Sequence, residues 1–266
     1  MKELNLQEIK EVEFNILKVF DAFCKENNIK YYLAHGTLLG AIRYKKFIPW
    51  DDDIDVLIPR EDYNRLVATF KDDDRYKLFA YEKNPDFRFP FGKLCDMTTK
   101  KVEPADNGVE LGLDIDLFPL DVWDDDLEKA KKEARKIKKN MGHLALSKLE
   151  KSQDQSPLKR AIKTLLIRLC KMKGSGHYIE KIQKASYRKD VKEKKYIGCK
   201  AWCVYGEKGI IPARAFAETM EIEFEGEMFP APAGYDEYLT CLFGDYLPEP
   251  PEEKRKTHHV FTAYKL

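Results

Sequence analysis

The sequence has no apolar run long enough to span a membrane. A membrane-spanning helix needs about 20 consecutive apolar residues, and the 266-residue chain contains no such run. The opening segment, M-K-E-L-N-L-Q-E-I-K, also lacks the apolar core of a signal peptide. We therefore expect a cytoplasmic protein.

The chain also lacks a disulfide framework and a strong net charge. Its six cysteines are scattered, so we expect reduced, partly buried thiols. A zinc site of Cys199 and Cys203 with His258 and His259 is the alternative, although this spacing matches no standard zinc motif. The formal net charge of +1 indicates no class of partner, and the length allows one large domain or a domain with an insert.

The most informative stretch is His35–Val56, which reads H-G-T-L-L-G-A-I-R-Y-K-K-F-I-P-W-D-D-D-I-D-V. The preceding segment, Lys30–Ala34, is aromatic and apolar, as expected of a strand. Gly36 allows a turn in which backbone approaches a ligand closely. Thr37 suits the N-cap of a helix over Leu38–Tyr44. Free N–H groups at that helix start would bind an anion such as phosphate.

An acidic and apolar alternation ends this stretch at Asp53-Ile54-Asp55-Val56. On a strand, residues two apart share a face, so Asp53 and Asp55 point together while Ile54 and Val56 enter the core. Two carboxylates beside an anion site repel each other, and hard oxygen ligands suit Mg²⁺ or Mn²⁺. The alternative is a solvated acidic turn. An EF-hand and a P-loop are excluded by pattern.

A second alternating segment, Gly112–Pro119, predicts another strand, on which Asp114 and Asp116 share a face. Upstream, Tyr76–Asp96 is strand-like, with Phe87, Phe89 and Phe91 expected in the sheet core. Lys93 stands at the end of this aromatic strand and would be costly to bury without a partner. We interpret it as a phosphate ligand, with a surface lysine as the alternative.

Helices and strands mix along the whole chain, which predicts an α/β or α+β protein. The remaining expected elements are helices over Asn5–Glu26, Arg60–Phe70, Leu127–Lys148, Pro157–Lys173 and Asp236–Leu242, and strands over Ala201–Gly206 and Met220–Phe224. Residues 126–200 carry 23 Lys and Arg against 8 Asp and Glu. We therefore divide the chain into a core, 1–125, a basic helical insert, 126–195, and a C-terminal part, 196–266, that completes the core and active site.

Several of these motifs together resemble one known family. They are the H-G-T-L-L-G-A-I-R and F-I-P-W-D-D-D-I-D runs, I-D-L-F-P-L-D at Ile115–Asp121, G-D-Y-L-P from Gly244, and the P-P-E-E-K-R-K-T-H-H ending. The chain resembles the LicD family, which includes bacterial phosphocholine transferases and fukutin-type sugar-phosphate transferases. The resemblance implies an α+β nucleotidyltransferase-type mixed sheet core with flanking helices.

The resemblance also implies a catalytic site and its ligands. Asp53, Asp55 and Asp116 would be catalytic and would bind Mg²⁺, with Mn²⁺ or Asp114 as alternatives. The substrate or phosphate-binding residues would be His35, Gly36, Thr37, Arg43 and Lys93. An aromatic cage for a quaternary ammonium would draw on Trp50, Trp202 and Tyr205.

The implied reaction moves phosphocholine from CDP-choline to a sugar hydroxyl and releases CMP. The acceptor would be a cell-surface glycan precursor, free or lipid-linked, of teichoic acid or lipopolysaccharide, and no nucleic acid is implied. The alternatives are another phospho-alcohol from a CDP-polyol, nucleotidyl transfer to a small molecule or RNA, and a non-catalytic anion- or lipid-binding protein.

The segment Pro157–Lys173 has a Leu/Ile stripe at helical spacing with Lys and Arg elsewhere. One interpretation is peripheral docking on the inner face of the plasma membrane, where anionic lipid attracts the basic residues. The other is that Leu158, Ile162, Leu165, Leu166 and Leu169 pack on the protein's own core.

Overall fold

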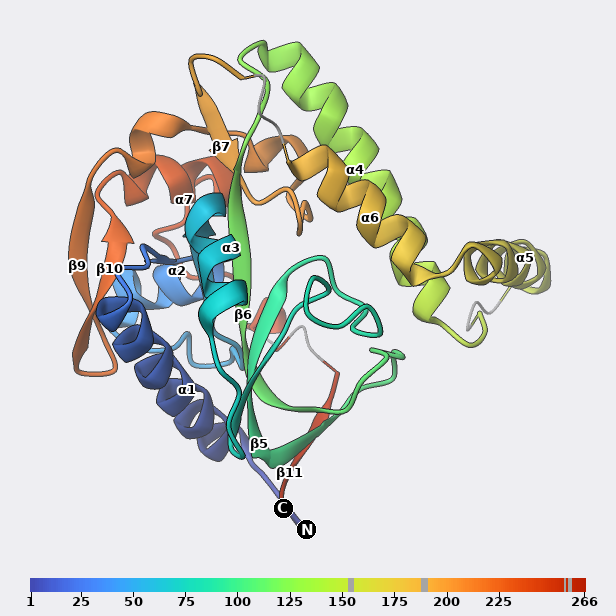
Figure 1. The fold of residues 1–266 in the computed structure, drawn as a ribbon, viewed down its shortest axis with the longest axis horizontal. Coiled ribbons are helices and arrows are strands. Elements are labelled where there is room, and N and C mark those ends of the chain that lie inside the picture. The colour runs from blue at the N-terminus through green and yellow to red at the C-terminus, as the bar shows by residue number, and fades with distance from the viewer. Residues whose placement is uncertain (153–155, 188–190, 256, 258–259) are drawn as a thin grey trace.

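The computed structural model (Figure 1) describes residues 1–266 except 153–155, 188–190, 256 and 258–259. The described chain is an α+β protein built on one mixed sheet, which confirms the predicted fold class. None of its described helices is both long and apolar enough to cross a bilayer.

Seven α-helices and eleven strands make up the described part of the chain. The helices are α1 (Leu6–Glu26), α2 (His35–Tyr44), α3 (Arg60–Thr69), α4 (Leu127–Lys148), α5 (Pro157–Lys173), α6 (Ser175–Ser186) and α7 (Tyr235–Phe243). The strands are β1 (Lys2–Glu3), β2 (Tyr32–Leu33), β3 (Asp55–Pro59), β4 (Tyr76–Phe79), β5 (Gly92–Val102), β6 (Leu111–Val122), β7 (Tyr196–Gly198), β8 (Ile211–Pro212), β9 (Thr219–Phe224), β10 (Glu227–Pro232) and β11 (Thr262–Lys265).

The sheet order is β1-β11-β5-β6-β3-β2, with β4 beside β5 and with β7 joining β6 to β8. All pairs are antiparallel except β3 and β6, which run parallel. These two strands carry the two acidic alternations of the sequence. The single parallel pair therefore sets the predicted carboxylates Asp55 and Asp116 side by side.

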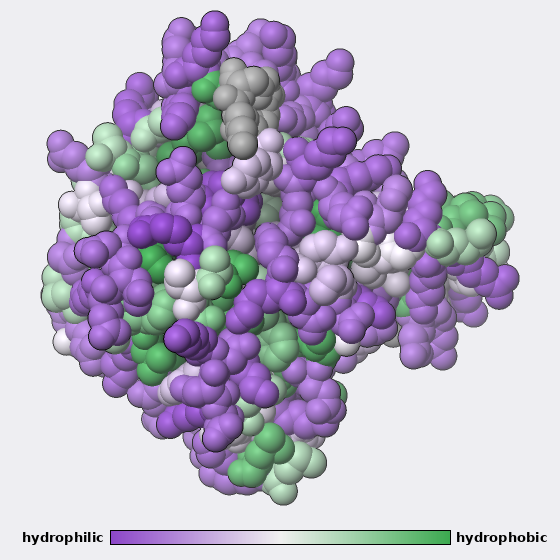
Figure 2. Space-filling model, in the orientation of Figure 1, coloured by the Kyte–Doolittle hydropathy of each residue, from purple (hydrophilic) through white to green (hydrophobic). Residues whose placement is uncertain are grey.

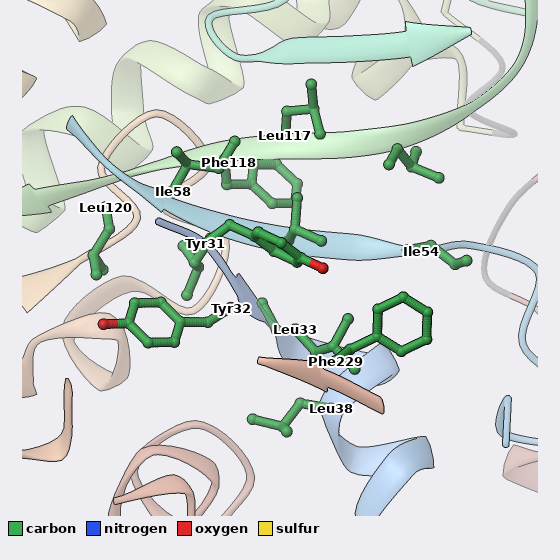
Figure 3. Packing of buried hydrophobic residues seen from close by; sticks show 14 of the residues in the cluster. Tyr31, Tyr32, Leu33, Leu38, Ile54, Ile58, Leu117, Phe118, Leu120 and Phe229 are labelled. Atoms are coloured by element: carbon green, nitrogen blue, oxygen red, sulfur yellow. The ribbon is translucent and has the colours of Figure 1, made fainter. Parts of the chain in front are cut away.

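The main core lies where α1, α2 and the β9–β10 hairpin pack on β2, β3 and β6. Figure 3 shows Leu33, Ile58 and Leu117 from the sheet packed together with Leu38 of α2 and Phe229 of β10. Ile54 and Val56 are fully buried, as the alternation predicts. The core thus holds the residues between the aspartates and leaves the carboxylates at its edge.

Two buried polar contacts hold the segments that precede and follow β3. Arg60 at the start of α3 forms two hydrogen bonds with Asp121 of β6, at 2.7 and 2.9 Å. Lys10 of α1 donates to the backbone carbonyls of Ile48 and Pro49, both at 3.0 Å. The first contact ties α3 to the sheet, and the second holds the loop that leads into the acidic run.

Two strand predictions are wrong in part. Tyr76–Asp96 is not one strand, because β4 ends at Phe79 and β5 begins at Gly92. Phe87 and Phe91 are still buried, so side-chain burial rather than strand geometry explains their apolar pattern. Ala201–Gly206 forms turns instead of a strand, with backbone hydrogen bonds from Val204 to Trp202 and from Gly206 to Cys203.

Helices α4, α5 and α6 follow β6 and form an arm with its own small core. The predicted helices Leu127–Lys148 and Pro157–Lys173 match α4 and α5. Ala134, Ile137 and Leu144 of α4 pack with Ile179 and Ile182 of α6 in this second apolar cluster. Figure 1 shows the arm reaching away from the sheet, with α5 at its tip.

Candidate active site

A cavity of about 1230 Å³ opens beside the parallel pair β3 and β6. Its walls come from the start of α2, the acidic loop before β3, the turns around Trp202 and the segment after α7. Four carboxylates line it: Asp51, Asp53, Asp55 and Asp116. Aromatic rings line it as well: Trp50, Phe118, Trp202, Tyr205, Phe243 and Tyr246.

Strand register brings Asp55 and Asp116 together. They are direct partners in the β3–β6 ladder, and the Asp116 N–H donates to the Ile54 carbonyl at 2.8 Å. Asp53 lies two residues before Asp55, just outside the strand, and faces the same cavity. The predicted trio of Asp53, Asp55 and Asp116 therefore meets in one place, with Asp116 on the neighbouring strand.

The acidic loop contributes a second grouping. Carboxylate oxygens of Asp51, Asp52 and Asp53 lie within 4.8 Å of one another, the one such cluster found in the described part of the chain. Asp52 is buried, whereas Asp51 and Asp53 are half-buried. Sequence reasoning did not select Asp51, although its place in the D-D-D run beside Asp53 was the available signal.

Helix α2 begins earlier than predicted. It starts at His35 with Ala34 as its N-cap, and no side chain caps it. Thr37 is therefore not the N-cap: its hydroxyl accepts a hydrogen bond from the Asp55 N–H at 2.8 Å. A Cβ on Gly36 would lie 2.7 Å from an Asp51 oxygen, so glycine lets that carboxylate approach the helix start. Thr37 and Gly36 thus position the aspartates.

His35 lies against the carboxylates in an unusual backbone conformation. Its φ of 43° is in the left-handed region, which non-glycine residues rarely adopt. Its Nδ1 lies 3.3 Å from Asp55, and its ring stacks on Tyr205 with centroids 5.4 Å apart. Burial lowers the pKa of His35 to about 4, which the Asp116 carboxylate only partly opposes. His35 is therefore neutral at neutral pH.

This pKa predicts a pH-dependent stability. An unfolded histidine titrates near pH 6.5, so between about pH 6.5 and 4 the unfolded chain binds a proton that folded His35 rejects. The His35 contribution is present in full above pH 6.5 and falls as the pH drops, by about 2 kcal/mol at pH 5. In His35→Asn, the fall in unfolding free energy between pH 7 and pH 5 should be smaller by that amount in urea titrations. An unchanged difference would contradict a neutral His35.

Lys93 lies in a buried ion cluster rather than on the cavity wall. Its ammonium contacts Asp114 at 2.5 Å and also Asp116, and Lys101 binds the other Asp114 oxygen at 3.0 Å. Burial opposes the charge of Asp114, but Lys101 and Lys93 lower its pKa to about 2. Burial raises the pKa of Asp116, which Lys93 offsets only in part.

The contacts in this cluster distinguish Asp114 from Asp116, the two candidates for the third carboxylate of the site. The Asp114 side chain is 3% exposed and held by two lysines, whereas that of Asp116 is 20% exposed and lines the cavity. Of these two carboxylates, Asp116 is therefore the one that a ligand in the cavity can reach.

Arg43, near the end of α2, lines the cavity and also holds the segment after α7 in place. Its guanidinium donates to the backbone carbonyls of Tyr246 and Pro248, at 2.6 Å for Pro248. These residues belong to the G-D-Y-L-P run, so the contact explains how a C-terminal motif reaches the acidic site. Sequence reasoning treated Arg43 only as a charge partner for phosphate.

The alternative zinc site gains no support from the described residues. Cys199 accepts a hydrogen bond from the Trp202 N–H at 3.3 Å, and burial raises its pKa well above the ordinary range. Cys203 is buried, whereas Cys199 is half-buried. His258 and His259 lie outside the described residues, so that half of the prediction stays open.

Comparison with known proteins identifies relatives of the whole chain and of parts of it. Residues 28–141 match the family described as LicD/FKTN/FKRP, nucleotidyltransferase domain. The chain is 33% identical to the lipopolysaccharide cholinephosphotransferase LicD of Haemophilus influenzae over 279 aligned positions, covering 100% of both proteins. Uncharacterized proteins of Rickettsia typhi and Rickettsia prowazekii are 39% and 45% identical over 61 and 49 residues, 22% and 18% of this chain and 20% and 18% of theirs.

Proposed function

The chain belongs to the LicD family, and we propose from this premise that it transfers phosphocholine from CDP-choline to a sugar hydroxyl, releasing CMP. The acceptor would be a lipopolysaccharide or teichoic acid precursor. The observation that carries the proposal is the carboxylate set of Asp51, Asp53, Asp55 and Asp116 in one cavity lined by aromatic rings.

The residues present fit a divalent cation. Asp51, Asp52 and Asp53 offer oxygens within 4.8 Å of one another, and Asp55 faces the same cavity. Hard oxygen donors suit Mg²⁺ or Mn²⁺. When bound, such an ion would neutralise charge on the donor diphosphate and the leaving nucleotide.

The chain's own residues would supply the remaining functions. Asp116 would complete the carboxylate set or orient the acceptor hydroxyl as its base. Thr37 holds the Asp55 backbone, and His35, neutral and buried, packs beside the Asp55 carboxylate. Phe118 and Tyr205 line the cavity together with the aspartates, and their rings would limit water around the transferred group.

Choline recognition would use the aromatic rings. A quaternary ammonium binds over such faces with about 1–2 kcal/mol per favourable contact. The Trp50 ring already has the Arg255 guanidinium 5.5 Å from its centroid, whereas Trp202 contacts Phe91 edge-on. Trp202 is therefore our first candidate for the choline headgroup.

The matched pair Trp202→Leu and Trp50→Leu tests this assignment. We expect Trp202→Leu to lower kcat/KM for CDP-choline about tenfold relative to a CDP-polyol. Trp50→Leu should change this ratio less. The CDP-polyol donor, whose headgroup carries no charge, controls for general damage to the cavity. An equal loss with both donors in Trp202→Leu would remove Trp202 from headgroup recognition.

The reaction class is tested by following two labels. With CDP-choline labelled in the choline and in the cytidine, the proposal predicts phosphocholine on the glycan and free CMP. Nucleotidyl transfer would instead place the nucleoside monophosphate of CTP or ATP on the acceptor. A non-catalytic anion- or lipid-binding protein would instead give no turnover and no Mg²⁺-dependent thermal stabilisation by CDP ligands.

A further inference from the structure

Helix α5 exposes an apolar face that the rest of the described chain leaves uncovered. Leu158, Leu165 and Met172 are 71%, 58% and 84% exposed, and Ile162, Leu166 and Leu169 are exposed as well. At about 100° per residue, all six fall within roughly a third of the helix circumference. The expectation that this stripe packs on the protein's own core is therefore wrong.

Helix α5 packs against α4 and α6 in a way that leaves its apolar face exposed. Only Ile167 and Cys170 of this helix are buried, and its main contacts are with α4 and α6. Figure 2 shows an apolar patch at the tip of the arm, where Figure 1 draws α5, with hydrophilic residues around it. The patch thus projects away from the sheet and the catalytic cavity.

The charge of α5 has one sign. The helix carries six Lys and Arg and no Asp or Glu. At the same 100° per residue, Lys159 lies at one edge of the apolar face and Arg168 at the other, whereas Arg160 and Lys171 lie on the opposite side of the helix. A helix with an apolar face and a Lys/Arg-rich polar face is the type that lies in the interface of an anionic bilayer.

A lysine-lined cavity adjoins this face. A cavity of about 420 Å³ lies between α4, α5 and α6. Lys136 and Lys139 of α4, Lys173 of α5 and Lys181 of α6 line it, together with Leu166 and Leu169. It combines four cationic groups with two residues of the exposed stripe. This chemistry matches a phospholipid whose phosphate lies at the lysines and whose acyl chains continue along the apolar side chains.

We propose that the apolar face of α5 and the four-lysine cavity together form a docking surface for an anionic phospholipid bilayer. The apolar face enters the boundary between headgroups and acyl chains, and the cavity takes a lipid phosphate. A second copy of this chain fits less well, because an isologous contact would bring two helices of the same charge together. The inference does not depend on the transferase reaction.

Co-sedimentation of the full chain with vesicles tests the proposal. We expect binding to vesicles of phosphatidylcholine mixed with phosphatidylglycerol, weaker binding at high salt, and little binding to phosphatidylcholine alone. No donor or acceptor is present, so failure of binding and failure of the reaction are separate results. Equal binding to both vesicle types, or no binding to either, would overturn the proposal.

Two double variants address the two parts of the surface. Ile162→Ser/Leu165→Ser removes apolar contact, and Lys136→Glu/Lys139→Glu reverses charge at the cavity. Each should lower vesicle partitioning at least about tenfold. All four side chains are exposed, so the thermal midpoint should be retained.

Matched controls lie elsewhere on the surface. Met228→Ser on β10 removes an exposed apolar side chain, and Lys71→Glu/Lys77→Glu reverses two exposed lysines. Both should bind vesicles like the wild type. Equal losses in the controls would mean diffuse charge attraction, and a concentration-dependent dimer abolished by Ile162→Ser/Leu165→Ser would assign the face to self-association. Either result would overturn the proposal.

Discussion

Asp53→Asn and Asp55→Asn should each lower kcat/KM at least about a thousandfold, which corresponds to about 4 kcal/mol of transition-state stabilisation. Both carboxylates face the cavity, and Asn keeps the shape of the side chain while removing its charge. The thermal midpoint without metal should stay near that of the wild type. Stabilisation by Mg²⁺ and a CDP ligand should be lost, which differential scanning fluorimetry would measure.

Asp74→Asn is the matched control, because Asp74 belongs to the exposed acidic loop D-D-D at 72–74. It should retain both turnover and Mg²⁺-dependent stabilisation. A wild-type rate in Asp53→Asn or Asp55→Asn with excess Mg²⁺ would refute the metal assignment.

Asp51→Asn distinguishes the two carboxylate groupings. If the cluster of Asp51, Asp52 and Asp53 holds the ion, Asp51→Asn should weaken Mg²⁺-dependent stabilisation as strongly as Asp53→Asn. If Asp53, Asp55 and Asp116 hold the ion without Asp51, the Mg²⁺-dependent stabilisation of Asp51→Asn should match that of the wild type.

The alternation of acidic and apolar residues was enough to predict that Asp53 and Asp55 face one cavity at the edge of the core. Burial of Ile54 and Val56 forces the neighbouring aspartates to the edge of the core, whichever strand lies next to β3. The same logic placed Asp116 on a face of β6. Helix periodicity likewise predicted α4 and α5 with their observed bounds.

Contacts between distant segments could not be predicted in the same way. Lys93 and Asp114 are 21 positions apart, and only the β5–β6 register turns them into a buried pair. The start of α2 was also missed, because the Thr37 hydroxyl accepts a hydrogen bond from the Asp55 N–H, 18 positions along the chain, instead of capping its own helix. Local pattern carries no information on such partners.

The exposure of the apolar stripe on α5 could not be predicted from the sequence either. Its Leu/Ile stripe has the spacing of a helix that packs on a core, and spacing alone cannot tell which surface covers it. In the structure only Ile167 and Cys170 of this helix are buried, and the stripe stays exposed.

Lys93→Met should be the most destabilising of the substitutions considered, by about 3–5 kcal/mol of unfolding free energy. It removes the cation that Asp114 and Asp116 share and leaves their charges buried, with Lys101 still bound to Asp114. Desolvation would then raise the carboxylate pKa values in the folded state, so the loss should be larger at pH 8 than at pH 5. Urea titrations at the two pH values measure both effects.

The double variant Lys93→Met/Asp114→Asn isolates the ion pair from the loss of packing. Because it removes one buried charge with its partner, it should recover part of the stability lost in Lys93→Met. Asp116→Asn should do the opposite: it should keep most of the stability and lose turnover, since Asp116 lines the cavity. If Asp114→Asn instead lost turnover at wild-type stability, the catalytic role would pass to Asp114, and Lys93 would be a group that orients it.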